Sequence, residues 1–324
     1  MRRLLSEIVL IPWAGVLIGL VVISAVVSLM SPYFLTFSNI LGNVALYFSW
    51  FAIAGFGEAL VMIGGGLDLS VGSIMGLSGM VSALVLAGGM PLWAALVAGL
   101  AVGALAGIVN GLAVTRIGLN PFIATLATLG IFRGMAYGIV QGQAITPPSN
   151  AAGTAFATLG AGVIGEVPVP VIVMVGLAVV MFVALDQTPF GRHVYALGGN
   201  ESATRLLGLD INRLKMTLYV ISGLTAAIGG ILLTARGGTA LPDAAEGYEL
   251  GVIAGVIIGG VSLAGGQGTI PGVLIGAALL GVINNGIVLA GLAGYWQQLI
   301  IGLVIAAAAG LDVFRQRLAY LRSA

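Results

Sequence analysis

The stretch PLWAALVAGLAVGALAGIVNGLAV, residues 91–114, contains no charged side chain. It is long enough to cross a membrane as a helix, which takes about 20 mostly apolar residues. Glycine recurs in it at every fourth position, at Gly99, Gly103, Gly107 and Gly111. Residues four apart share one helix face, and a face without side chains lets a second backbone approach closely. The stretch therefore predicts a transmembrane helix that packs tightly against a neighbour along its glycine face.

The composition of the whole chain extends this prediction to the other segments. Of the 324 residues, 59% are hydrophobic and only 7% are charged, and the mean hydropathy is +1.15. A soluble domain carries about 25% charged residues to cover its water-facing surface. We therefore expect an all-α integral membrane protein with a single transmembrane domain over residues 1–324. The net charge of +1 gives no reason to expect a nucleic-acid partner, and the absence of cysteine excludes thiolate metal sites.

The chain divides into ten predicted spans, separated by turn-rich or charged breaks. The eighth span is short, and the segment 64–72 is open to a second interpretation as a broken or re-entrant helix. Counts of nine and eleven are therefore alternatives. The ten predicted spans are residues 8–30, 40–62, 69–89, 91–114, 121–140, 168–185, 216–235, 250–264, 270–290 and 295–311.

The basic residues predict how these spans are oriented, because short cytoplasmic loops carry Lys and Arg in excess. With ten spans, both termini and the loop at 186–215 fall on one side, and the loop at 141–167 falls on the other. The first side, which we assign to the cytoplasm, holds ten of the twelve basic residues: Arg2, Arg3, Arg116, Arg192, Arg205, Arg213, Lys215, Arg315, Arg317 and Arg322. The opposite side holds the acidic residues Glu166, Asp243, Glu246 and Glu249.

The many glycines raise the question of nucleotide binding. A phosphate-binding loop needs a lysine directly after its last glycine. The only lysine is Lys215, which stands between Leu214 and Met216. The chain therefore contains no standard phosphate-binding loop, and energy from ATP would have to come from another subunit.

The loop at 186–215 contains a short helix signal in GGNESATRLLG, residues 198–208. Asn200 is a good N-cap, Glu201 suits the positive start of a helix, and Gly208 suits the left-handed residue after its last turn. Isolated helices of fewer than about 12 residues are marginal in water, so this one should pack against something. A second protein is one candidate, and the protein's own inner surface is the alternative.

Several ordered motifs resemble those of ribose-type (monosaccharide) ABC transporter permeases. The segment around Phe190-Gly191-Arg192 and residues 196–208 is similar to the coupling-helix region of that family. GGGLDLSVGS at 64–73 resembles its glycine-rich signature, with Leu67 where isoleucine is common. Further similar stretches are Asn110-Gly111, NPFIATL at 120–126 and IGGVSLAGG at 258–266. The resemblance extends over most of the chain.

This resemblance implies a subunit of a sugar importer in the bacterial inner membrane. It implies three partners: a cytoplasmic ATPase subunit that binds ATP and Mg, an external substrate-binding protein, and a second permease copy or homologue. This chain would bind no cofactor, no metal and no nucleic acid, and would not be an enzyme. The coupling role that the family assigns to its cytoplasmic helix falls on Gly199, Asn200, Glu201, Ala203, Arg205 and Gly208.

Polar residues within predicted spans are costly, so each needs a reason. Three charged residues, Glu58, Asp68 and Arg133, are candidates for the translocation path or its gate, or for locking the fold. For Asp68, followed by Ser70, we favour a structural cap at a helix start. Hydrogen-bonding residues without charge suit a sugar path, and they serve helix packing equally well. These are Asn110, Asn120, Thr125, Thr128, Asn284, Asn285, Gln297 and Gln298.

Two other classes of transporter stay open on the sequence. An ion-coupled secondary transporter would need coupling carboxylates near mid-membrane, and Glu58 and Asp68 are both predicted toward the inner face. A permease of another ABC import family, such as that for branched-chain amino acids, has a similar plan. Substrate binding would be needed to separate it from a sugar permease.

Overall fold

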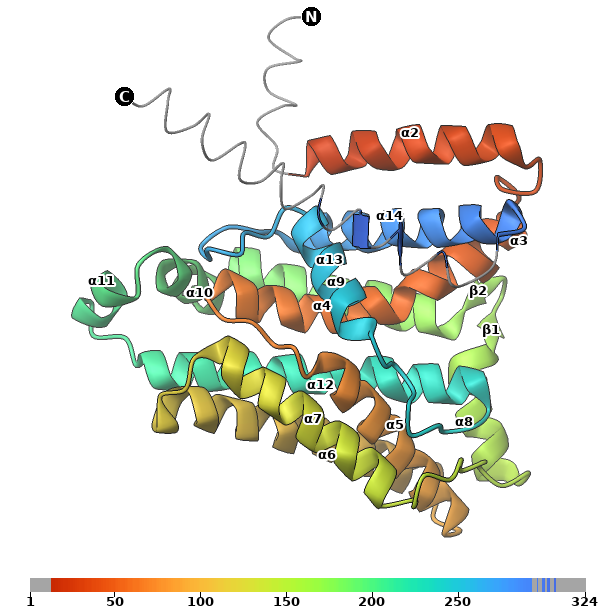
Figure 1. The fold of residues 1–324 in the computed structure, drawn as a ribbon, viewed down its shortest axis with the longest axis horizontal. Helices are drawn as coiled ribbons and strands as arrows, with labels where there is room; N and C mark the ends of the chain where they lie inside the picture. Colours follow the sequence, from red (N-terminus) through yellow and green to blue (C-terminus); the bar gives the residue numbers. More distant parts are fainter. Residues whose placement is uncertain (1–12, 293–295, 297–298, 301, 304–305, 307–324) are drawn as a thin grey trace, which may run out of the picture.

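The computed structural model describes residues 13–292 and residues 296, 299–300, 302–303 and 306. Within these residues one short hairpin, β1 paired antiparallel with β2, accompanies a set of helices (Figure 1). Two segments, η1 and η2, are π-helical. The elements are α2 (Ala14–Met30), α3 (Phe37–Asn39), η1 (Ile40–Ala45), α4 (Leu46–Ile63), α5 (Val71–Ala87), α6 (Leu92–Leu112), η2 (Ala113–Ile117), α7 (Pro121–Gly138), α8 (Ala151–Ala161), β1 (Val163–Ile164), β2 (Val167–Pro168), α9 (Val169–Gln187), α10 (Pro189–Gly199), α11 (Glu201–Leu206), α12 (Ile211–Gly237), α13 (Tyr248–Ile258) and α14 (Ile270–Leu289).

Five helical stretches of the described chain are long and apolar enough to cross a membrane, which confirms a multi-pass, mostly helical architecture. Shorter helices α2, α5 and α13 overlap three further predicted spans, and α7 overlaps the predicted span 121–140. The predicted span 295–311 lies largely outside the described residues, so the count of ten stays a prediction. The five long stretches are Phe37–Ile63, Leu92–Ile117, Val169–Gln187, Ile211–Gly237 and Ile270–Leu289.

The structure adds helices that the sequence pattern did not predict. Helix α8 and strand β1 lie within the connection 141–167, β2 lies at its end, and α10 lies within the loop 186–215. The loop 186–215 is also shorter than predicted, because α9 continues to Gln187 and α12 begins at Ile211. The glycine, proline and threonine residues around α8 favour loops and turns, so the segment was not predicted to be helical. The sequence signal for α8 is the N-cap Asn150, whose side-chain oxygen accepts a hydrogen bond from the Gly153 amide at 2.9 Å.

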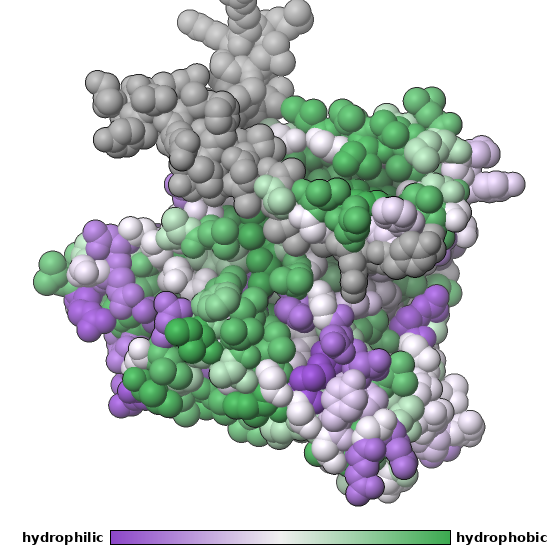
Figure 2. All heavy atoms as spheres, viewed as in Figure 1, coloured by the Kyte–Doolittle hydropathy of each residue, from purple (hydrophilic) through white to green (hydrophobic). Residues whose placement is uncertain are grey.

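The two ends of the helices differ in the connections that they carry. Helices α10 and α11 lie at one end, at the left of Figure 1, while α8 and the hairpin lie at the opposite end. Figure 2 shows apolar side chains between these ends and hydrophilic ones gathered around α11 and over the opposite connections. We call the α11 end the inner end and the α8 end the outer end. This arrangement fits an apolar belt in lipid between two wet surfaces.

Helix α12 lies against α4, α5 and α6. The glycine face of α6 explains how closely the backbones of α6 and α12 approach each other. A Cβ atom on Gly103 would overlap the carbonyl oxygen of Gly223, and one on Gly107 would overlap that of Tyr219. Both partners belong to α12. The predicted tight packing along the glycine face is confirmed.

Candidate functional site

Helix α11 at the inner end has the capping that the sequence predicts. The side-chain oxygen of Asn200 accepts a hydrogen bond from the Ala203 amide at 2.9 Å. The backbone of Gly208, after the last turn, is left-handed with φ 81°. Thr204 is buried and donates to the Asn200 carbonyl at 2.8 Å, which fixes one side of the helix. The helix is therefore held in place by short-range contacts at both of its ends.

Glu201 ties α11 to the bundle. Its carboxylate accepts from Lys215 Nζ on α12 at 2.7 Å and from Arg205 Nη2 within α11 at 3.2 Å. The hydrogen bond from Lys215, together with the positive charges of Lys215 and Arg205, holds the pKa of Glu201 below its ordinary value. The acidic member of the predicted coupling set is thus paired inside this chain, and its carboxylate joins α11 to α12.

Two leucines at the end of α11 face solvent. Leu206 is 89% exposed and Leu207 is 76% exposed, beside the exposed Arg205. Contiguous exposed apolar patches mark sites of protein contact, and this adjacent pair of leucines is a candidate for one. The predicted coupling set did not include these leucines. The sequence signal was an adjacent pair of leucines directly before Gly208 in a charged loop.

Behind α11, three glycine-rich segments meet at one point, which we call the glycine junction: residues 64–66, 198–199 and 265–268. The Gly266 amide donates to the Ile63 carbonyl at 2.8 Å. A Cβ atom on Gly198 would overlap that same carbonyl oxygen. Tyr195 of α10 donates from its hydroxyl to the Gly268 carbonyl at 2.8 Å, and burial raises the pKa of Tyr195 to about 12. The helix pair α10–α11 is therefore packed directly on the α4–α5 and α13–α14 connections.

The α4–α5 connection carries Asp68, which is fully buried at the centre of a polar network. Asp68 Oδ1 accepts from the Ser70 amide at 3.0 Å, the Ser70 hydroxyl at 2.6 Å and Asn110 Nδ2 at 3.3 Å. Asp68 Oδ2 accepts from the Ser222 hydroxyl of α12 at 3.0 Å. The predicted contact with Ser70 is present, but Ser70 rather than Asp68 is the N-cap of α5, and no side chain caps the first turn of that helix. The additional bonds to α6 and α12 make Asp68 a link between separate helices.

Other predicted polar residues join this network from neighbouring helices. Glu58 Oε1 of α4 accepts from the Asp68 amide at 3.1 Å. Thr128 of α7 donates to Asn110 Oδ1 at 2.6 Å, and Thr125 donates to the carbonyls of Leu67 and Pro121 at 3.3 and 2.8 Å. Most buried polar groups of this network are satisfied by one another, but the second carboxylate oxygen of Glu58, Oε2, is buried without a hydrogen-bond partner among the described residues. The structure thus brings Glu58, Asp68, Asn110 and Thr125 together.

Two other predicted residues lie elsewhere and bond to the backbone. Arg133 Nη1 donates to the carbonyls of Pro242 and Ala244 at 2.8 and 2.7 Å, so it holds an outer connection. Asn120 is exposed and caps α7, where its Oδ1 accepts from the Phe122 amide at 2.9 Å. For Arg133, bonds to backbone carbonyls agree with the alternative in which this residue locks the fold.

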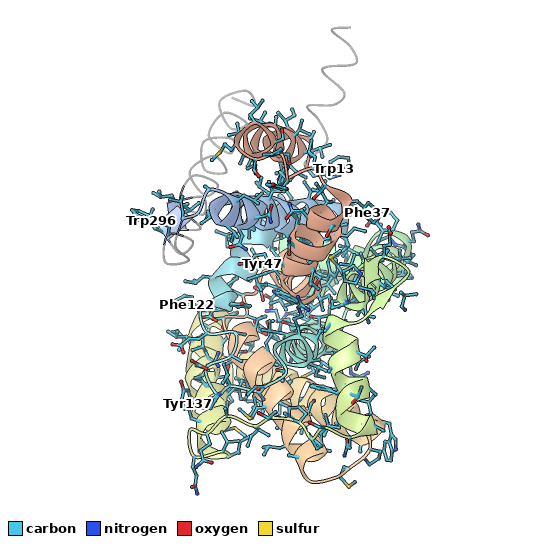
Figure 3. All side chains as sticks on the ribbon, turned by 90° about the vertical axis from the view of Figure 1, so that its right-hand side faces the viewer. Trp13, Phe37, Tyr47, Phe122, Tyr137 and Trp296 are labelled. Carbon is cyan, nitrogen blue, oxygen red and sulfur yellow. The ribbon has the colours of Figure 1, made fainter. Side chains whose placement is uncertain are left out.

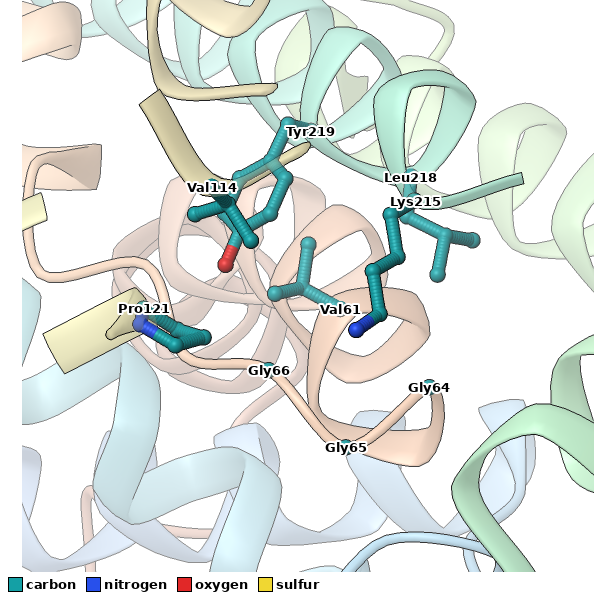
Figure 4. Close-up of a pocket in the computed structure, with 9 residues that line it drawn as sticks. All are labelled: Val61, Gly64, Gly65, Gly66, Val114, Pro121, Lys215, Leu218 and Tyr219. Carbon is teal, nitrogen blue, oxygen red and sulfur yellow. The ribbon is translucent and has the colours of Figure 1, made fainter. Parts of the chain in front are cut away.

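Asn284 and Asn285 lie on the outer half of α14 and line a cavity of about 300 Å³. Asn285 forms a reciprocal amide pair with Asn39: Asn39 Nδ2 donates to Asn285 Oδ1 at 2.9 Å, and Asn285 Nδ2 donates to Asn39 Oδ1 at 3.0 Å. Gln297 and Gln298, which were predicted beside them, lie outside the described residues. The inner end carries a much smaller cavity of about 20 Å³, lined by Gly64, Gly65 and Gly66 among others (Figure 4).

Comparison with known proteins identifies relatives along almost the whole chain. Residues 40–309 match the family model described as branched-chain amino acid transport system / permease component. The chain is 41% identical over 298 residues to the ribose import permease protein RbsC of Bacillus subtilis (strain 168), covering 92% of each chain. It is 40% identical to the D-allose transport system permease protein AlsC of Escherichia coli (strain K12), covering 92% of this chain and 90% of AlsC. It is 35% identical to the L-arabinose transport system permease protein AraH of the same strain, covering 94% and 91%.

Proposed function

This chain belongs to the branched-chain amino acid transport system permease component family, as a ribose-type ABC transporter permease, and we propose that it is the membrane-spanning subunit of an ATP-driven monosaccharide importer. It is a transport component rather than an enzyme. The curated relatives are named for ribose, allose and arabinose, which supports a small sugar as the substrate. The proposed partners are a cytoplasmic ATPase subunit that binds ATP and Mg²⁺, an external substrate-binding protein and a second permease copy or homologue, assembled in a bacterial inner membrane.

The observation that carries this proposal is α11. It is a two-turn helix that is capped at both ends, fixed to α12 by the Glu201–Lys215 ion pair, and tipped by the exposed Leu206 and Leu207. The chain has no phosphate-binding loop, so it needs a partner to supply ATP energy. A rigid, partly apolar projection at the inner end is a suitable contact for that partner. Gly199, Asn200, Glu201, Ala203, Arg205 and Gly208 shape this projection, and the two leucines are its proposed anchors.

The glycine junction supports a route from this contact to the rest of the bundle. Displacement of α10 and α11 would push on the backbone at Ile63 through Gly198 and Gly266. The α4–α5 connection that follows Ile63 holds Asp68 and its network. Coupling is carried by contiguous packed groups, and this contact is backbone against backbone, with little freedom to yield. We assign Glu58, Asp68, Asn110 and Thr125 to the gate that this route operates.

The contact with the ATPase subunit is tested by removing one anchor. Leu206→Ala should weaken association of the two subunits by roughly tenfold, because burying a leucine contributes about 1.5–3 kcal/mol. Leu241→Ala is the matched control, since Leu241 is 47% exposed at the outer end. Association is measured by titrating the purified ATPase subunit onto the permease in nanodiscs. Equal affinity of the Leu206 and Leu241 variants would remove α11 from the interface.

The energy source is tested in proteoliposomes that contain the permease and the subunits copurified with it. Uptake of D-ribose should require ATP on the side of the membrane that the α11 end faces. It should also require a substrate-binding protein on the opposite side. An ion gradient alone should drive none. Uptake by this chain alone on an ion gradient would overturn the proposal in favour of a secondary transporter. The internal bonding of Asp68 argues against that alternative, because a coupling carboxylate must be free to exchange its ion.

A further inference from the structure

The outer cavity is lined by polar, aromatic and aliphatic residues of five elements, α3, η1, α4, α12 and α14. Its volume of about 300 Å³ is at the lower end of the range for small-molecule sites, about 300–1,000 Å³. Figure 3, which looks onto the outer end, shows one lining residue, Tyr47, just below α14. The cavity is lined by Asn39, Gly42, Asn43, Leu46, Tyr47, Trp50, Arg236, Asn284, Asn285, Val288 and Leu289.

The wall contributed by η1 is π-helical, a rare geometry that is frequent at functional sites. The wider π turn sits between Asn39 and α4. On this wall Asn43 Nδ2 donates to Asn39 Oδ1 at 2.9 Å, and Asn39 pairs with Asn285 across the cavity. Asn39 and Asn285 are only 6% and 7% exposed. Their amides thus form a rigid, buried ladder that joins α14 to the π-helical wall.

Several polar groups around the ladder have no partner among the described residues. The indole Nε1 of Trp50, a side chain that is only 7% exposed, is buried without a partner, while the half-buried Asn284 and the exposed Arg236 present their polar ends to the cavity without a side-chain hydrogen bond among the described residues. Buried indole N–H groups usually find a hydrogen-bond partner. A cavity that offers several unpaired donors, an amide ladder and aromatic faces suits a solute with many hydroxyl groups and one apolar face.

The charge of the lining separates two substrate classes. None of the lining residues carries a carboxylate, and Arg236 is the one charged residue among them. A free amino acid could pair its carboxylate with Arg236, but its ammonium group would find no anionic partner in the lining. A sugar has no ammonium group, and its hydroxyl groups match amides and a guanidinium. The lining therefore favours a neutral sugar over an amino acid.

The cavity at the inner end of the bundle is much smaller than the outer cavity. Its volume of about 20 Å³, between the 64–66 turn, Lys215 and Tyr219, is room for about one water molecule (Figure 4). Of these two cavities, only the outer one has room for a sugar. Resting on the proposed function, we propose that this outer cavity is an entry site, where Asn284, Trp50 and Arg236 bind a monosaccharide before it crosses.

Saturation-transfer NMR with D-ribose tests the site on the permease–ATPase complex in nanodiscs. Asn284→Leu and Trp50→Phe should each lower the affinity for D-ribose about fivefold, the effect of one hydrogen bond of about 1 kcal/mol. The matched controls are Asn212→Leu, which changes an exposed asparagine at the inner end, and Trp93→Phe, which changes a tryptophan that is 67% exposed. Both controls should bind as the parent does.

Three outcomes would overturn the entry site: no D-ribose signal on the parent complex, equal loss in variants and controls, or L-leucine binding as well as D-ribose. Each of them leaves the proposed function standing if ATP-dependent uptake of D-ribose is still observed in proteoliposomes. Conversely, uptake that never depends on ATP would reject the proposed function whatever the NMR shows. Reduced binding in Asn284→Leu and Trp50→Phe, with unchanged controls, supports the site.

Discussion

Replacing Gly198 with alanine should uncouple ATP hydrolysis from transport while the permease and the ATPase subunit remain assembled. The new Cβ atom would overlap the carbonyl oxygen of Ile63, which also accepts the Gly266 amide. Neither backbone can move aside without shifting α10 or the α4–α5 connection. Overpacking of this kind costs about 1–3 kcal/mol, so we expect the sugar transported per ATP to fall roughly tenfold to a hundredfold.

The neighbouring Gly199 provides the control for this prediction. It belongs to the same turn of α10, yet a Cβ atom there would meet no atom within 4 Å. Gly199→Ala should therefore transport at the parental ratio. The ratio is measured in proteoliposomes by following sugar uptake and phosphate release together. If the two alanine variants behave alike, the glycine junction does not transmit the movement of α11.

Asp68→Asn should lower both the melting temperature and the transport rate. The carboxylate of Asp68 accepts four hydrogen bonds, from Ser70, Asn110 and Ser222, and an asparagine side chain has only one acceptor oxygen. At least one buried donor would be left facing an amide NH₂ group. Each buried group left unsatisfied costs about 1–3 kcal/mol, and 1 kcal/mol shifts the melting temperature of a chain of this size by about 2–4 °C.

The comparison variant is Asp243→Asn, because Asp243 is exposed in an outer connection. It should melt at the parental temperature. The melting temperature is measured in detergent as the temperature at which the monodisperse peak in size-exclusion chromatography is lost. An Asp68→Asn protein that melts at the parental temperature would contradict the structural role. If that protein also loses ATP-driven uptake, the result would support the assignment of Asp68 to the gate alone.

Local signals in the sequence were sufficient for several parts of this protein. Hydropathy over about 20 residues predicted the long helices, and the glycine repeat at 99–111 predicted the close approach of α6 to a neighbouring backbone. Asn200 and Gly208 predicted the ends of α11, because capping bonds form within one turn of helix. The sequence also indicated which loops share one side of the membrane, because basic residues are enriched in short cytoplasmic loops.

Only the tertiary structure decided which distant residues meet. Gly198 could not be distinguished from Gly199 in the sequence, although a Cβ atom on the first would overlap a backbone oxygen and one on the second would meet no atom within 4 Å. The partners of Asp68 come from α6 and α12, and Asn39 meets Asn285 from 246 positions away. Hydropathy, capping and glycine spacing act over a few residues and are the same whichever neighbour a helix finds. Which amides pair, and which glycines lie in contact, follows from the packing of whole helices.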